Sequence, residues 1–106
     1  MKSFNMPIEA TLGVIGGKWK CIILCHLETG KKRTSELKRL MPNITQKMLT
    51  QQLRELESDE VICRIVYKEV PPKVEYELSH YGRSLKPIID SMCAWGQKHI
   101  NYTNTD

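Results

Sequence analysis

The spacing of the apolar residues changes near Glu60, and this change most constrains what the chain can fold into. Before it, leucines recur at the spacing of a helix with one buried face: Leu49, Leu53 and Leu56. After it, residues 62–70 and 74–78 alternate in the manner of strands. Pro71 and Pro72 separate these strands, and because proline cannot donate to a strand ladder, the tip must leave the sheet. The pattern predicts helices followed by a hairpin.

Local signals place the helices on either side of this change. Pro7 suits the first turn of a helix reaching Ile15, and a second helix spans 18–27. Thr34 is expected to cap a third helix whose inner face carries Leu37, Leu40 and Met41.

After the turn at Pro42, Thr45 caps a fourth helix that runs to about Ser58. Ile44 and Leu49 flank this cap as a hydrophobic staple. Ser79 starts a C-terminal helical stretch to about Tyr102, which Pro87 must kink or split.

The resulting order predicts a mainly α fold with a small β-hairpin, the winged helix-turn-helix. We expect one domain over residues 1–106, with the helix-turn-helix at about 34–58, the wing at about 62–78 and a C-terminal helix at about 79–102. No apolar run approaches the ~20 residues of a membrane span, and the first residues show no signal-peptide stretch. The expected location is cytoplasmic, without membrane attachment.

Positive charge is concentrated in one part of the chain. Residues 31–54 hold seven basic residues and one acid, a net charge of +6, so the remainder carries −2 of the total +4. A solvated helical face explains a charge run alone, but this run coincides with the predicted helix-turn-helix, where a positive field favours a polyanion.

The outer face of the fourth helix has side chains suited to reading bases. It has no acid between Thr45 and Arg54. Gln pairs with adenine, Lys and Arg pair with guanine, and Thr offers a hydroxyl and a methyl group. Thr45 and the free amides at the helix start suit a phosphate. The predicted DNA-binding residues are Arg33, Lys38, Thr45, Gln46, Lys47, Thr50, Gln51, Arg54 and, on the wing, Lys68 and Lys73.

The four cysteines do not predict a cofactor or metal site. Cys21 and Cys25, beside His26, share a helix face, but an apolar helix and no evident second ligand pair favour buried structural thiols. Cys63 lies in the first strand. For Cys93 we expect burial, with a redox or intersubunit disulfide role as the alternative. No catalytic set or phosphate loop appears, so an enzyme is not expected.

Several motifs in order resemble one family. They are Ile15-Gly-Gly-Lys-Trp-Lys, Arg33 with Ser35-Glu-Leu, Lys47-Met-Leu-Thr, Leu53-Arg-Glu-Leu-Glu, Val70-Pro-Pro-Lys-Val-Glu-Tyr, Gly82-Arg-Ser-Leu and Trp95-Gly. The chain resembles the HxlR family of bacterial transcriptional regulators, relatives of the MarR proteins, from Pro7 to His99.

This resemblance implies a homodimer that binds operator DNA and represses or activates nearby genes. It also implies that residues 45–54 form the recognition helix and 70–73 the wing. Members that sense oxidants carry a cysteine directly before the N-terminal proline. Here that position is Met6, so the redox role is not transferred.

The C-terminal stretch contains an apolar seam that fits two interpretations equally. It is either a dimer interface or an intramolecular core stripe: Leu85, Ile89, Met92, Trp95, Gly96 and Ile100. Double-stranded DNA and a second copy are the expected partners, and an unknown small-molecule effector would sit between the helix-turn-helix and the dimer helices. The alternative function is a protein-interaction module whose basic face docks an acidic partner.

Overall fold

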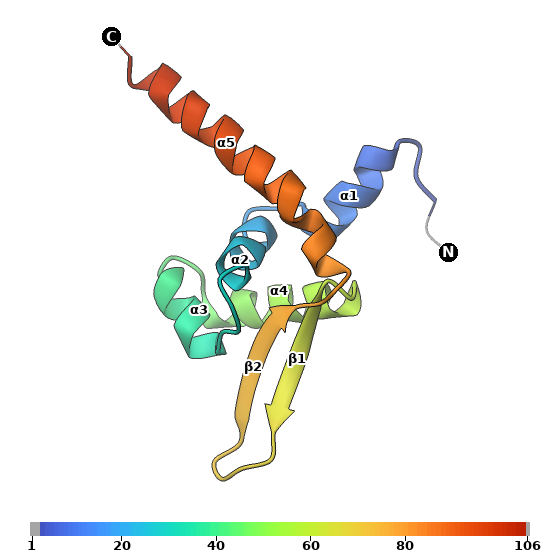
Figure 1. The fold of residues 1–106 in the computed structure, drawn as a ribbon, viewed down its shortest axis with the longest axis vertical. Helices are drawn as coiled ribbons and strands as arrows, with labels where there is room; N and C mark the ends of the chain where they lie inside the picture. The colour runs from blue at the N-terminus through green and yellow to red at the C-terminus, as the bar shows by residue number, and fades with distance from the viewer. Residues whose placement is uncertain (1–2, 106) are drawn as a thin grey trace.

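The computed structural model describes residues 3–105, which form a mainly α body with a protruding hairpin (Figure 1). The elements are α1 (Pro7–Ile15), α2 (Lys20–Leu27), α3 (Thr34–Leu40), α4 (Gln46–Ser58), β1 (Ile62–Tyr67), β2 (Lys73–Leu78), a short 3-10 helix η1 (Gly82–Leu85) and α5 (Lys86–Thr103). This order confirms the predicted winged helix-turn-helix.

The core forms around the leucine stripe of α4. Leu49, Leu53 and Leu56 are almost completely buried, as are Ile23 and Leu24 on α2. Further core residues come from the ends of neighbouring elements: Ile15, Leu27, Leu37, Met41, Ile44, Val61, Ile62 and Ile89. Full burial of a Leu or Ile side chain contributes about 1.5–3 kcal/mol, so this stripe fixes which face of α4 remains outside.

The hairpin is attached to the body by a contact that the sequence analysis did not predict. β1 and β2 are antiparallel, from Ile62 opposite Leu78 to Tyr67 opposite Lys73. Lys32, just before α3, forms a bridge with Tyr76, with N···O distances of 3.0 and 2.8 Å between their backbones. The bridge ties the wing strand to the helix-turn-helix.

Two helix boundaries differ from the predictions. Thr34 is the first residue of α3, and Arg33 takes the cap position, where its backbone N–H donates to Glu36 Oε1 at 2.9 Å. The second helix begins at Lys20 instead of residue 18, because the chain still bends at residues 17–19 and Gly17 has a φ of +86°.

The prediction for one core residue of α3 is also wrong. Leu40, expected to face inward, is 48% exposed. Leu37 and Met41, four residues apart, already form the buried side of this short helix, and Leu40 lies beside that line.

The other two predicted caps, Thr45 and Ser79, and the break at Pro87 are confirmed. Thr45 Oγ1 accepts from the Met48 N–H at 3.1 Å. Ser79 Oγ accepts from the Gly82 N–H at 2.8 Å and donates to the Glu60 carbonyl at 2.6 Å. Pro87 lies in the first turn of α5, at the division between η1 and α5.

The C-terminal half of α5 projects from the body (Figure 1). The radius of gyration is 15.5 Å, whereas a compact chain of this length has about 13 Å. The apolar seam divides accordingly. Ile89 is buried in the core and Leu85 packs against it, whereas Met92, Trp95 and Ile100 are about half or more exposed. No helix within residues 3–105 has the length and hydropathy to cross a membrane.

Gly82 is required by the close approach of η1 to Val61, the residue directly before β1. A Cβ at this position would overlap the carbonyl oxygen of Val61. We expect Gly82→Ala to lower the free energy of unfolding by about 1–3 kcal/mol, measured by urea denaturation.

Gly13 provides the matched control. It lies inside α1, and a Cβ there meets no atom within 4 Å. Gly13→Ala should leave stability unchanged or raise it by up to about 1 kcal/mol, because alanine favours a helix. Equal stability of the two variants would contradict the close approach.

Candidate nucleic-acid interface

The turn between α3 and α4 is held by backbone bonds and by a buried side chain. The Ile44 N–H donates to the Met41 carbonyl at 3.2 Å, and both side chains are buried. Thr45 then caps α4. These contacts fix the direction in which α4 leaves the turn.

The structure brings the predicted base-reading residues together. Gln46, Lys47, Gln51 and Arg54 are exposed and Thr50 is half-buried. These five residues line one surface hollow of about 410 Å³ on the side of α4 away from the leucine stripe. We call this surface the outer face of α4. It offers amides, a hydroxyl and two cations, the groups that recognise base edges.

A second hollow joins this outer face to the wing. It measures about 570 Å³ and is lined on one side by α4, including Thr50, Arg54 and Glu57, and on the other by Arg64, Val74 and Tyr76 of the hairpin. Glu57 places one carboxylate beside these cations. Arg64 was missing from the predicted site, although it alternates with the apolar residues of its strand. Its exposed cation extends the basic surface from α4 onto β1.

The other predicted cations lie around this surface in different states. Arg33 and Lys68 are exposed. Lys38 is half-buried, and its Nζ donates to the Pro42 carbonyl at 3.3 Å. Lys73 begins β2, where its Nζ lies 3.8 Å from Glu75 Oε1 and 4.9 Å from the centre of the Tyr67 ring. Lys73 is therefore held at the base of the tip, with part of its charge offset.

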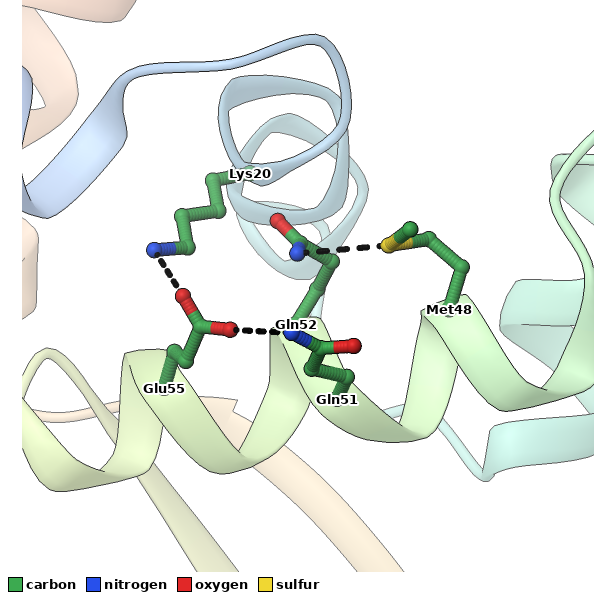
Figure 2. A network of polar contacts seen from close by, with 5 residues as sticks. All are labelled: Lys20, Met48, Gln51, Gln52 and Glu55. Carbon is green, nitrogen blue, oxygen red and sulfur yellow. Dashed lines mark hydrogen bonds and ion pairs between the residues drawn. The ribbon is translucent and has the colours of Figure 1, made fainter.

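A polar network supports α4 on the side of α2 (Figure 2). Lys20 on α2 is only 7% exposed, and its Nζ lies 2.8 Å from Glu55 Oε1. Gln51 Nε2 donates to the other carboxylate oxygen of Glu55 at 3.1 Å. The hydrogen bond from Lys20, followed by the one from Gln51, holds the pKa of Glu55 below its usual range.

This network orients Gln51, one of the predicted base-reading side chains. A carboxylate only accepts hydrogen bonds, so the Gln51 amide must turn its NH₂ group toward Glu55. Gln51 and Glu55 follow Lys20 by 31 and 35 residues in the chain. The only sign of this contact in the sequence is a basic residue, Lys20, in an otherwise apolar helix.

The cysteines are not equivalent. Burial, followed by the nearby Cys93, raises the pKa of the Cys21 and Cys25 thiols, which disfavours the reactive thiolate. Both are half-buried, and Cys63 is exposed. The prediction that Cys93 is buried is wrong, because Cys93 is exposed on α5, although it lies close to Cys21 and Cys25 of α2. Within residues 3–105, no three His, Cys, Asp or Glu side chains gather as metal ligands.

Comparisons with known proteins agree with this architecture. A family model described as HxlR-like helix-turn-helix matches residues 14–104. The HTH-type transcriptional regulator YtcD of Bacillus subtilis is 78% identical over 100 residues, which cover 94% of this chain and 79% of YtcD.

Solved structures show the same likeness. The redox regulator HypR in its reduced form is 53% identical, with a TM-score of 0.89 over 92% of this chain and 97% of HypR. A MarR-family regulator from Enterococcus faecalis V583 is 36% identical, with a TM-score of 0.80 over 97% of each chain.

The Lys20–Glu55 pair predicts a pH dependence. The pKa of Glu55 is lower in the folded chain than in the unfolded chain. The ion pair therefore stabilises the fold fully at neutral pH, and this stabilisation is lost as the pH falls from the usual pKa of a glutamate to the lower pKa of folded Glu55. We expect Glu55→Gln to be less stable than the original chain at neutral pH, with the difference shrinking on acidification, in urea denaturation at several pH values.

Glu57→Gln is the control, since Glu57 is an exposed α4 carboxylate without an ion pair among the described residues. It should change stability little at any pH. A Glu55→Gln deficit that stays constant from neutral to acid pH would show that the ion pair does not carry the effect.

Proposed function

The chain belongs to the HxlR family of helix-turn-helix transcriptional regulators, and we propose that it binds operator DNA as a homodimer, with α4 in the major groove and the wing on the minor groove or backbone. Through this contact it represses or activates nearby genes.

The outer face of α4 is the observation that carries this proposal. Between Thr45 and Arg54 it has no acid, and its five polar side chains share one hollow beside the wing. The leucines bury the opposite side of α4 in the core, so only the outer face is available to a partner. A helix of this kind fits the major groove, which admits an α-helix.

We assign the roles by the chemistry of each side chain. Lys47 and Arg54 donate to guanine, Gln46 and Gln51 pair with adenine, and Thr50 contacts a thymine methyl or a base edge. Thr45 and the first amides of α4 hold a phosphate, and Arg33 and Lys38 contact the flanking backbone.

The wing adds contacts outside the major groove. Lys68 is exposed beside the tip, and Arg64 lies between α4 and the tip. We assign both to phosphates or the minor groove, with Lys73 contributing more weakly because Glu75 shares its charge.

The exposed apolar part of α5 supports a homodimer. Trp95 is 66% exposed, and Met92, Gly96 and Ile100 lie on the same side of the helix. Leu85 and Ile89 pack within one protomer, so the proposed contact begins at Met92. A twofold dimer places two recognition helices about 34 Å apart, one turn of the duplex, and a single small module covers too little DNA for high specificity.

DNA binding is tested by fluorescence anisotropy with a labelled duplex from the upstream region of the protein's own gene. We expect salt-sensitive binding, because cations on the protein displace counterions from phosphates. Lys47→Ala and Arg54→Ala should each weaken binding to the preferred sequence by about 1–3 kcal/mol if the contact is to a base.

The control is Lys98→Ala, which removes an exposed cation from the projecting half of α5. It should leave the preference among sequences unchanged. Absence of salt-sensitive binding up to micromolar protein would refute DNA binding and favour docking of an acidic protein. Equal losses for all three variants would refute the role of α4.

The dimer is tested by sedimentation equilibrium. Trp95→Glu should shift the protein to monomer, because a charge buried in an apolar interface costs far more than one left in water. Ala94→Glu is the control, since Ala94 is exposed and lies about 100° away from Trp95 around the helix axis. An unchanged dimer in the Trp95→Glu variant would place the interface elsewhere.

A further inference from the structure

A cleft that the proposed DNA contact does not use lies on another part of the molecule. It measures about 410 Å³ and forms where the end of α2, the end of β2, η1 and the start of α5 meet. None of the residues that line it belongs to α3 or α4. Its walls carry apolar side chains and charges of both signs, the acids Glu28 and Glu77 and the bases Lys31, Arg83 and Lys86.

Glu28 is the group in this cleft that most needs an explanation. Its Oε1 atom is buried and has no hydrogen-bond partner among the described residues. Leaving a buried carboxylate oxygen unpaired is costly. Glu28 also caps the C-terminal end of α2, where the helix dipole disfavours a negative charge. Helix stability does not account for a carboxylate here. Lys86 lies near enough for its charge to interact with that of Glu28, but Lys86 forms its ion pair with Asp90, so Glu28 Oε1 still lacks a hydrogen-bond donor.

The cleft also offers cations, and they are not equally available. Lys86 Nζ is already 2.6 Å from Asp90 Oδ2 on its own helix. Arg83 and Lys31 line the cleft without an ion pair among the described residues. The guanidinium of Arg83 suits a carboxylate, which it binds through two parallel hydrogen bonds.

Between these charges lie Leu27 and Leu78, which supply an apolar surface. The cleft therefore presents an acceptor that lacks a donor, a cation that lacks an anion, and an apolar wall. A small ligand complementary to all three has an ammonium group, a carboxylate group and an apolar side chain.

We propose that this cleft binds an apolar α-amino acid, with its ammonium group on Glu28, its carboxylate on Arg83 and its side chain against Leu27 and Leu78. The ligand would join the end of the wing strand to the start of α5. Any effect on operator affinity rests on the proposed function, but the binding itself does not.

The proposal is tested by NMR titration of the full chain with L-leucine, with no DNA present. We expect saturable amide shifts that cluster at Leu27, Gly30, Leu78 and Arg83. Isoamylamine, which lacks the carboxylate, and isocaproate, which lacks the ammonium group, should bind at least about tenfold more weakly, since each loses a charge-assisted hydrogen bond.

Two variants test the assigned groups. Glu28→Gln and Arg83→Gln should each raise the Kd for L-leucine about tenfold or more. Glu28→Gln should melt no lower than the original chain, because it removes an unpaired buried charge. Glu69→Gln, in the exposed wing loop, is the matched control and should bind L-leucine unchanged.

The proposal is overturned if L-leucine, L-methionine and L-phenylalanine all fail to give saturable shifts at tens of millimolar. Equal binding of either truncated analogue, or an unchanged Kd in Glu28→Gln, would overturn it as well. Since the titration contains no DNA, these failures leave the operator proposal intact, and loss of DNA binding leaves the cleft intact.

Discussion

The burial of one leucine stripe fixes the arrangement of the molecule. Leu49, Leu53 and Leu56 cannot leave the core without exposing a large apolar surface, so α4 has a single rotation about its own axis. That rotation turns Lys47, Thr50 and Arg54 outward together. Which side chains of α4 are exposed is thus a consequence of what the opposite side buries, while the cap and the turn before it fix where the helix starts and in which direction it runs.

Features encoded by neighbouring residues could be predicted from the sequence. The Thr45 cap, the stripe of α4 and the hairpin with its proline-rich tip all depend on short spacings, and the structure contains them. The same logic located the division at Pro87, since proline cannot continue an earlier helix. The outer face of α4 follows directly from these local patterns.

Contacts between distant segments could not be predicted in this way. The bridge from Lys32 to Tyr76 and the ion pair from Lys20 to Glu55 join residues whose proximity is set by packing. For a related reason, the sequence could not predict which residues of α5 are exposed. Periodicity marks Ile89 and Met92 as one apolar seam, but it does not show where the body ends and the helix begins to project.

The central claim, that the outer face of α4 reads bases, is tested most directly by selecting bound sequences from a random pool of duplex DNA. The account predicts enrichment of two related half-sites whose centres lie about one helical turn apart, as a twofold dimer requires. It also predicts that a Thr50→Ala or Gln51→Ala protein enriches a different base at a defined position within each half-site. Enrichment of no sequence, or of one unchanged by those substitutions, would contradict it.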